Sequence, residues 1–173
     1  SSPSPVILPM SAVLSMYEIS VPVFLRALRN LRHALEKGEA HARAQGYEPT
    51  VLLQSRLYPD MLPLVRQVQI ATDTAKFGAA RLAGVESPRF EDVETTFDEL
   101  YARLEAVAAY LGTFDDAALA GSETRAVTLS TRARGDLSFD GRGYLLGFVL
   151  PNLFFHTATA HAILRHNGVP LGK

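Results

Sequence analysis

The most informative absence in this sequence of 173 residues is that of cysteine, which does not occur at all. Disulfide bonds, thiolate catalysis by the chain itself and cysteine-rich zinc sites are thereby excluded. A protein without cysteine also fits a reducing compartment. We therefore predict a cytoplasmic protein.

An excess of charge of one sign is lacking as well. The chain has 17 basic and 18 acidic residues, for a formal net charge of -1, and the two signs are mixed along the sequence. Binding to nucleic acid or to an anionic membrane needs a basic patch or tail. Neither partner is predicted here.

Long hydrophobic runs are also missing. A helix that crosses a membrane needs roughly 18 or more consecutive apolar residues. The longest run here, YLLGFVLPNLFF at 144–155, is interrupted by Gly147, Pro151 and Asn152. We interpret it as part of a core helix.

The beginning of the chain, SSPSPVILP, is rich in serine and proline. It lacks both the basic segment and the long apolar segment of a secretory signal peptide. We predict a flexible arm over residues 1–14, with the folded part starting near Met10 or Met16. Residues 15–173 show no internal repeat and are predicted to form one domain.

Apolar residues recur at three- and four-residue intervals over most of the chain, which predicts amphipathic helices. A first helix is expected to end at Gly46. A second is expected to start from Asp60 as its N-cap, with Pro63 in its first turn, and to end near residues 82–84. Their apolar positions are Phe24, Ala27, Leu28, Leu31 and Leu35, then Leu64, Val65, Val68, Ala71 and Ala75.

Two overlapping capping boxes predict the start of a third helix. Thr95 and Thr96 precede Asp98 and Glu99 by three residues, the spacing at which the two side chains bond to each other's backbone N–H groups. The apolar residues that follow are Phe97, Leu100, Leu104, Val107 and Leu111.

The segment AVTLSTRARGDLSF alternates apolar and polar residues around a Gly-Asp turn, which predicts a small β-hairpin. A last helix is expected from about Arg142 to His166, ended by Asn167 and Gly168. Four long helices with a hairpin between the third and fourth predict an all-α four-helix bundle.

Three histidines, His156, His161 and His166, share this last helix. A helix turns about 100° per residue, so positions five and ten apart point in different directions. Ligands on one helix converge on one ion only at three- or four-residue spacing. The three histidines therefore do not form a metal site by themselves.

Only His156 falls on the core-facing stripe of the last helix. Asn152 lies four residues earlier on the same stripe, and Gln67 lies on the stripe of the second helix, with Gln69 and Asp73 nearer its edge. Burying such groups without partners costs a few kcal/mol. We predict a polar pocket formed by Gln67, Asn152 and His156; the alternative is a set of hydrogen bonds that only specifies packing.

The sequence resembles the DinB/YfiT-like group of four-helix bundles, in a branch described only as a domain of unknown function. The stretches that carry the resemblance are SMYEISVPVFLRALRNL (15–31), LYPDMLPLVRQVQIATDTAK (57–76), ARLAGVE (80–86) and GYLLGFVLPNLFFHTATAHAILRHNGVPLGK (143–173). The resemblance implies an up-down-down-up bundle that is frequently a homodimer.

Better-known members of the group bind a divalent metal through three histidines, and some are thiol-dependent transferases or isomerases. Carried over to this chain, one ligand matches His156, while the other two positions hold Asn152 and Gln67. Amide oxygens suit Ca²⁺ or Mg²⁺ better than Zn²⁺ or Ni²⁺. The resemblance thus implies a degenerate metal site.

Three functions remain open from the sequence. The first is a small-molecule-binding bundle that has kept the pocket without the metal. The second is a transferase or isomerase in which His156 is a metal ligand or a general base, oriented by Asp73. The third is a structural, dimeric interaction protein that uses an exposed stripe containing His161.

Overall fold

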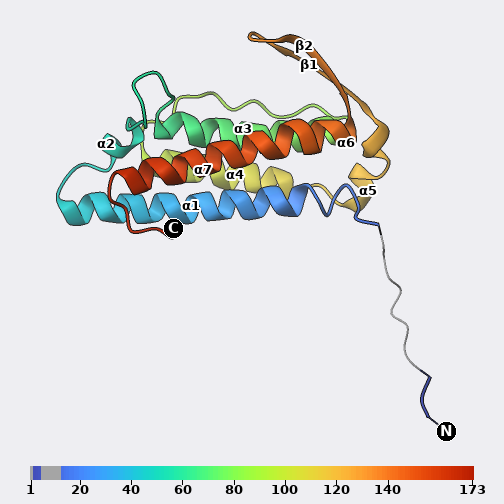
Figure 1. Ribbon diagram of the computed structural model, residues 1–173, viewed down its shortest axis with the longest axis horizontal. Coiled ribbons are helices and arrows are strands. Elements are labelled where there is room, and N and C mark those ends of the chain that lie inside the picture. Colours follow the sequence, from blue (N-terminus) through green and yellow to red (C-terminus); the bar gives the residue numbers. More distant parts are fainter. Residues whose placement is uncertain (1, 5–12) are drawn as a thin grey trace.

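The computed structural model describes residues 2–4 and 13–173, so most of the predicted N-terminal arm, residues 1–14, lies outside the described residues. Four long helices lie side by side along a common direction (Figure 1). They are α1 (Val21–Gln45), α3 (Leu64–Ala83), α4 (Phe97–Leu111) and α7 (Leu150–His166). No helix in the described ranges has the length and apolar character needed to cross a membrane.

Shorter elements connect the long helices. They are α2 (Thr50–Leu53), α5 (Asp116–Leu119), the 3-10 turn η1 (Ser122–Thr124), the strands β1 (Ala126–Thr131) and β2 (Gly135–Asp140), and α6 (Gly141–Tyr144). The π-helical turn η2 (Leu145–Val149) joins α6 to α7 without a break. The single last helix predicted from Arg142 to His166 therefore contains a π turn just before Pro151.

The ends of the helices follow the glycine and proline signals, with one correction. Gly46 and Gly84 end α1 and α3 with φ values of 81° and 69°. The predicted start of the second helix at Asp60 is wrong, because α3 begins at Leu64. Pro63 is extended, with ψ 169°, and the residue before a proline is itself disfavoured in helical geometry.

The predicted cap of the third helix is present at α4. The Thr96 side chain accepts a hydrogen bond from the Glu99 N–H at 3.1 Å, and the Glu99 carboxylate accepts one from the Thr95 N–H at 3.3 Å. The capping box thus uses Thr96 and Glu99 of the two overlapping candidates.

The predicted hairpin is confirmed. Val127 pairs with Phe139 and Leu129 with Leu137, so the four apolar residues share one face. The turn itself is made by residues 132–134 and not by Gly-Asp: Gly135, at φ 68°, already pairs with Thr131. A three-residue loop followed by a glycine of positive φ explains the shift.

The core lies between the long helices, where α7 packs against both α1 and α3, and α4 packs against the same two helices. Two glycines permit a close approach to the last helix. A Cβ on Gly38 would lie 2.7 Å from Leu164 Cδ2, and one on Gly78 would lie 2.8 Å from Val149 Cγ1. The packing of α7 and η2 therefore places the polar residues of the last helix directly against α3.

Candidate functional site

The contact between α3 and α7 joins two of the three predicted pocket residues. His156 Nδ1 lies 2.7 Å from Gln67 Oε1, although the two residues are 89 positions apart. Gln67 is 2% exposed, and His156 is half-buried. We refer to Gln67 and His156 together as the α3–α7 polar pair.

The orientation of the Gln67 amide fixes the protonation of the imidazole. Gln67 Nε2 donates to the backbone oxygen of Leu62 at 3.1 Å, so the amide oxygen is the atom that faces His156. An amide oxygen only accepts hydrogen bonds, so His156 Nδ1 must carry the proton and donate it. The neutral ring then has its lone pair on Nε2.

The surroundings of His156 favour this neutral form. Burial lowers the pKa of His156 below its ordinary value of 6.5, and the charge of Arg66 lowers it further. The Phe155 ring meets the imidazole edge-on, with a centroid distance of 5.0 Å. At neutral pH the pair therefore holds an uncharged imidazole in one tautomer and one orientation.

Nε2 of His156 remains open. Within residues 2–4 and 13–173 it has no hydrogen-bond partner, and it is not among the buried polar atoms that lack one. The atom must therefore reach solvent. The pair thus presents a fixed lone pair at the molecular surface.

Asn152, the third predicted pocket residue, is engaged within its own helix. Its Nδ2 donates to the backbone oxygen of Phe148 at 2.6 Å. This side-chain bond lies in the turn that contains Pro151, which has no N–H to donate to the oxygen of Gly147. The structure thus brings Gln67 to His156 and directs the Asn152 amide N–H to the helix backbone.

Asp73, predicted to orient His156, lies elsewhere. Its carboxylate is 2.9 Å from Arg103 Nη2 and 3.3 Å from Lys76 Nζ. Asp73 follows Gln67 by six residues, about 600° of helical rotation, and so leaves the face that meets α7. The prediction is wrong, and Gln67 takes the orienting role instead.

Gln69, predicted to lie nearer the edge of the buried stripe of its helix, is buried against the segment 84–96. Gln69 is 2% exposed; its amide donates to Glu94 at 2.9 Å and accepts from Arg66 at 2.7 Å. Arg66 also binds Asp92 at 2.9 Å. These residues tie α3 to the segment 84–96 and form one side of a larger ionic network.

Arg103 is the centre of this network, and the sequence analysis missed it. Its side chain is 2% exposed and binds Asp73, Glu94 and Thr72 at 2.9, 3.0 and 2.8 Å. Arg103 lies three residues after Leu100 and four before Val107, so a cation on the apolar stripe was the available signal. The network links α3, α4 and the segment 84–96.

The other histidines are spread over α1 and α7. His33 and His166 are exposed, and His41 is partly exposed. His161 is also partly exposed, and its Nε2 lies 2.7 Å from the backbone oxygen of Gly172. None of these contacts involves the α3–α7 polar pair.

The residues present do not fit the three-histidine metal site of the better-known members of the group. His156 contributes one imidazole, Gln67 Oε1 accepts from His156 Nδ1, and the Asn152 amide N–H donates to the backbone of its own helix. In the described part of the chain, no three His, Cys, Asp or Glu side chains gather as a metal-binding group. Tight transition-metal sites use three or more such ligands.

Comparison with known proteins identifies the family. Residues 16–173 match the family described as Domain of unknown function (DUF1993). The chain belongs to this family. A crystal structure of a DinB family member protein from Shewanella denitrificans is 41% identical in sequence, has a TM-score of 0.83, and is matched over 91% of this chain and 89% of that chain. No curated protein matches the chain.

These findings confirm the predicted DinB-like protein in a branch of unknown function. The DUF1993 protein and the DinB family member share their fold over most of their lengths. The fold does not itself specify a reaction. The function must therefore be argued from the α3–α7 polar pair.

Proposed function

We propose that this DUF1993 protein binds a small polar molecule through Nε2 of His156. The observation that carries the proposal is the hydrogen bond from His156 Nδ1 to Gln67 Oε1, which leaves a lone pair of fixed direction on the other ring nitrogen. A neutral imidazole nitrogen accepts a hydrogen bond from an alcohol, amide, amine or thiol. The ligand class is therefore a hydrogen-bond donor.

The exposed Phe155 adds an apolar surface beside the acceptor. Its side chain is 57% exposed, and its ring contacts the imidazole edge-on. Sites for small molecules commonly combine aromatic surface with a few fixed polar atoms. A ligand with a donor group on a small apolar body suits this arrangement.

The proposal is tested with a library of polar fragments, monitored by ¹H–¹⁵N NMR spectra of the protein. Donor-bearing fragments should shift resonances of residues around His156 and bind His156→Gln at least tenfold more weakly. His166→Gln, at an exposed position of the same helix, is the matched control and should bind like the wild type. Fragment binding that is absent, or equal in both variants, contradicts the proposal.

A second candidate is a histidine-dependent transferase. The observation that favours it is again the hydrogen bond from His156 Nδ1 to the amide oxygen of Gln67. A hydrogen bond of this kind on Nδ1 fixes the tautomer of histidines that act as general bases. Nε2 would take the proton of a thiol while the sulfur attacks an electrophilic carbon and the leaving group departs with its electron pair. A metal is not needed for this step.

The transferase is tested by measuring how fast the protein makes a thiol react with 1-chloro-2,4-dinitrobenzene. The sulfur replaces chloride on the ring, and the product is followed by its absorbance. The rate above that of the uncatalysed reaction should disappear in His156→Gln and persist in Asn152→Ala. A rate that does not depend on His156 contradicts this candidate, and metal analysis of protein purified without chelator shows whether the rate follows a bound ion.

The whole-molecule arrangement completes the proposal. We infer the up-down-down-up order for α1, α3, α4 and α7, supported by the packing of α7 and α4 each against both α1 and α3.

The predicted homodimer is favoured by exposed apolar side chains on the last helix: Leu146, Phe154 and Phe155 are 46%, 47% and 57% exposed. Light scattering should give twice the mass of the chain; a monomer at all concentrations contradicts the dimer.

A further inference from the structure

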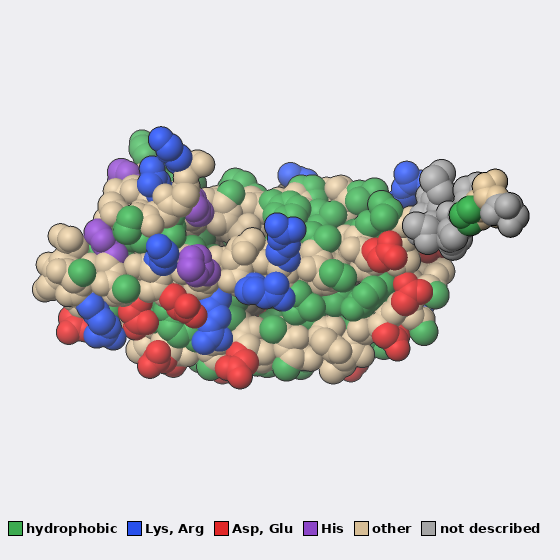
Figure 2. Space-filling view, turned by 90° about the horizontal axis from the view of Figure 1, so that it is seen from below, with side chains coloured by type: hydrophobic (Ala, Val, Ile, Leu, Met, Phe, Trp, Pro, Cys, Tyr) green, Lys and Arg blue, Asp and Glu red, His purple; other side chains and the backbone are tan. Residues whose placement is uncertain are grey.

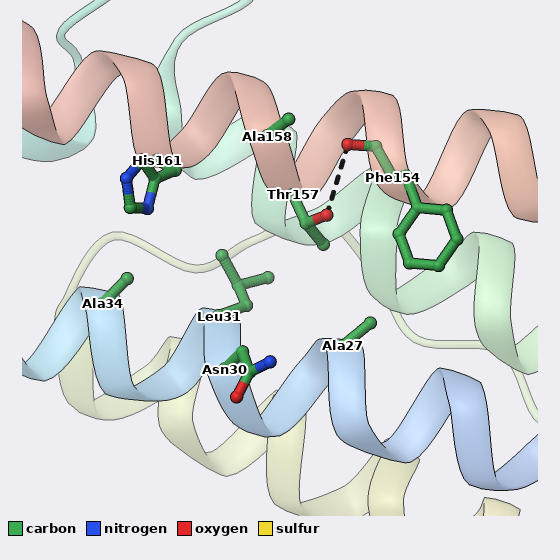
Figure 3. A pocket seen from close by; sticks show the side chains of 8 residues that line it. All are labelled: Ala27, Asn30, Leu31, Ala34, Phe154, Thr157, Ala158 and His161. Atoms are coloured by element: carbon green, nitrogen blue, oxygen red, sulfur yellow. Dashed lines mark hydrogen bonds between the residues drawn. The ribbon is translucent and has the colours of Figure 1, made fainter. Parts of the chain in front are cut away.

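A groove runs between α1 and α7 on the side of the last helix away from His156. One part is a cavity of about 390 Å³ between Ala27, Leu31 and Phe154 (Figure 3). An adjoining cavity of about 380 Å³ continues towards Lys37 and Gly172. The two cavities share Asn30, Ala34 and His161, so they form one groove.

The two parts of the groove differ in chemistry. The first part is mainly apolar, with alanines on both helices and Phe154 at one end (Figure 3). The second part holds His33, Lys37 and His161, from two different helices. A molecule that fills the groove would therefore meet apolar surface along its body and basic or donor groups at its head.

The positive charge of Lys37, in the second part of the groove, has no acidic partner within the groove. No ion pair among the residues that the structure describes involves Lys37. Histidines visible in the space-filling view lie towards the end of the molecule where α1 finishes (Figure 2). Acidic side chains also lie on that face, but none lines either cavity.

The N–H donor of His161 is already used within the chain at this end of the groove. Its Nε2 lies 2.7 Å from the backbone oxygen of Gly172, which can only accept, so this ring nitrogen donates its proton. The Lys37 ammonium group has three donors and no acceptor. The Lys37 ammonium group therefore matches the oxygens of a carboxylate.

We propose that the α1–α7 groove binds an amphipathic carboxylate, with the carboxylate at His33 and Lys37 and an acyl chain along the apolar part. Lys37 follows Ala27 by ten residues, about 15 Å of helix, which is long enough for an extended acyl chain of ten carbons. The site is separate from the α3–α7 polar pair. Its test therefore does not depend on ligand binding at Nε2 of His156.

Calorimetric titration with decanoate, kept below the concentration at which it aggregates, tests the proposal. The wild type should bind one decanoate per chain, and Lys37→Glu should weaken binding at least tenfold. Arg26→Glu makes the same charge change at another exposed position of α1 and should bind normally. 1-Decanol, which has the chain without the carboxylate, should bind at least tenfold more weakly than decanoate.

A second variant blocks the apolar part of the groove. Ala158 is exposed, so Ala158→Trp should fold and abolish decanoate binding; Ala27→Trp, on the opposite helix, serves if that variant does not fold. Absence of saturable binding, or binding unaffected by Lys37→Glu and by the tryptophan, overturns the proposal. So does a wild-type dimer that Ala158→Trp dissociates in light scattering, because a second copy would then occupy the groove.

Discussion

Gln67 and His156 show how one hydrogen bond can set the chemistry of a side chain. The Gln67 amide receives the Nδ1 proton and is itself held by the backbone of Leu62. The amide is neutral, so it orients the ring without stabilising its protonated form as a carboxylate would. A carboxylate such as Asp73 at this position would have made His156 more basic.

The first prediction concerns the pH dependence contributed by His156. Burial and Arg66 lower its pKa in the folded protein below the ordinary 6.5, so the unfolded chain binds this proton more tightly. The resulting stability is fully present above about pH 6.5 and is lost as the pH falls through the lowered pKa of the folded state. Urea unfolding at several pH values should show that His156→Gln loses less free energy of unfolding than the wild type as the pH falls.

A direct check is the NMR titration of the His156 ring. Its midpoint should lie below 6.5 in the folded protein. A midpoint at or above that value, or equal acid sensitivity of the wild type and His156→Gln, contradicts the neutral imidazole on which both candidate functions depend.

The second prediction concerns Arg103. Its replacement by alanine leaves the carboxylates of Asp73 and Glu94 without their closest cationic partner. Removing one member of a buried ion pair costs about 3–5 kcal/mol. Arg43, whose side chain is 67% exposed in its pair with Glu39, is the control, since alanine there should cost about 0–1 kcal/mol. Equal losses in urea unfolding would show that the buried network is not stabilising.

At the scale of elements, the last helix requires a glycine at its start, because a side chain there would have no space. A Cβ on Gly141 would collide with the backbone oxygen of Ser122, in η1. Backbone cannot move aside as a flexible side chain can. The junction of the hairpin, η1 and α6 therefore requires glycine for space and not for an unusual φ.

The third prediction compares two glycines of this helix. Gly141→Ala should lower the free energy of unfolding by about 1–3 kcal/mol, because the added methyl group overpacks the junction. Gly147 has nothing within 4 Å of an added Cβ, and alanine there should stabilise by about 0.5–1 kcal/mol through lower chain entropy. Thermal and urea unfolding measure both; a neutral Gly141→Ala would show that η1 can shift away.

At the scale of the whole molecule, buried apolar residues from all four long helices form one cluster with residues of the hairpin. The core members include Phe24 of α1, Leu64 of α3, Leu100 of α4, Ile163 of α7 and Val127 of β1. A continuous core predicts that the parts of the chain lose their structure together.

The fourth prediction is therefore a single unfolding transition. Circular dichroism of the helices and tyrosine fluorescence should give the same midpoint in urea, as a single domain over residues 15–173 requires. Tyr144 is buried beside the hairpin, and Tyr101 lies on α4. Separate midpoints for the two signals would show that the hairpin region unfolds independently of the long helices.

The sequence by itself determined the elements, because their signals are local. Apolar spacing marked the four long helices, Thr96 and Glu99 marked the start of α4, and alternation marked the hairpin. The start of α3 was misplaced because Asp60 has the side chain of an N-cap, while the effect of Pro63 on the residue before it decides where the helix begins.

Tertiary structure decided which polar residues meet. Gln67, Asn152 and His156 all lie on inward stripes, but only packing of α7 against α3 could show that Gln67 reaches His156. The Asn152 amide N–H goes to the helix backbone beside Pro151 instead. Arg103 became a buried cation because two other segments, α3 and residues 84–96, supply its acceptors. Periodicity gives the face of a helix, whereas a hydrogen bond also depends on the rotation and height of the neighbouring helix.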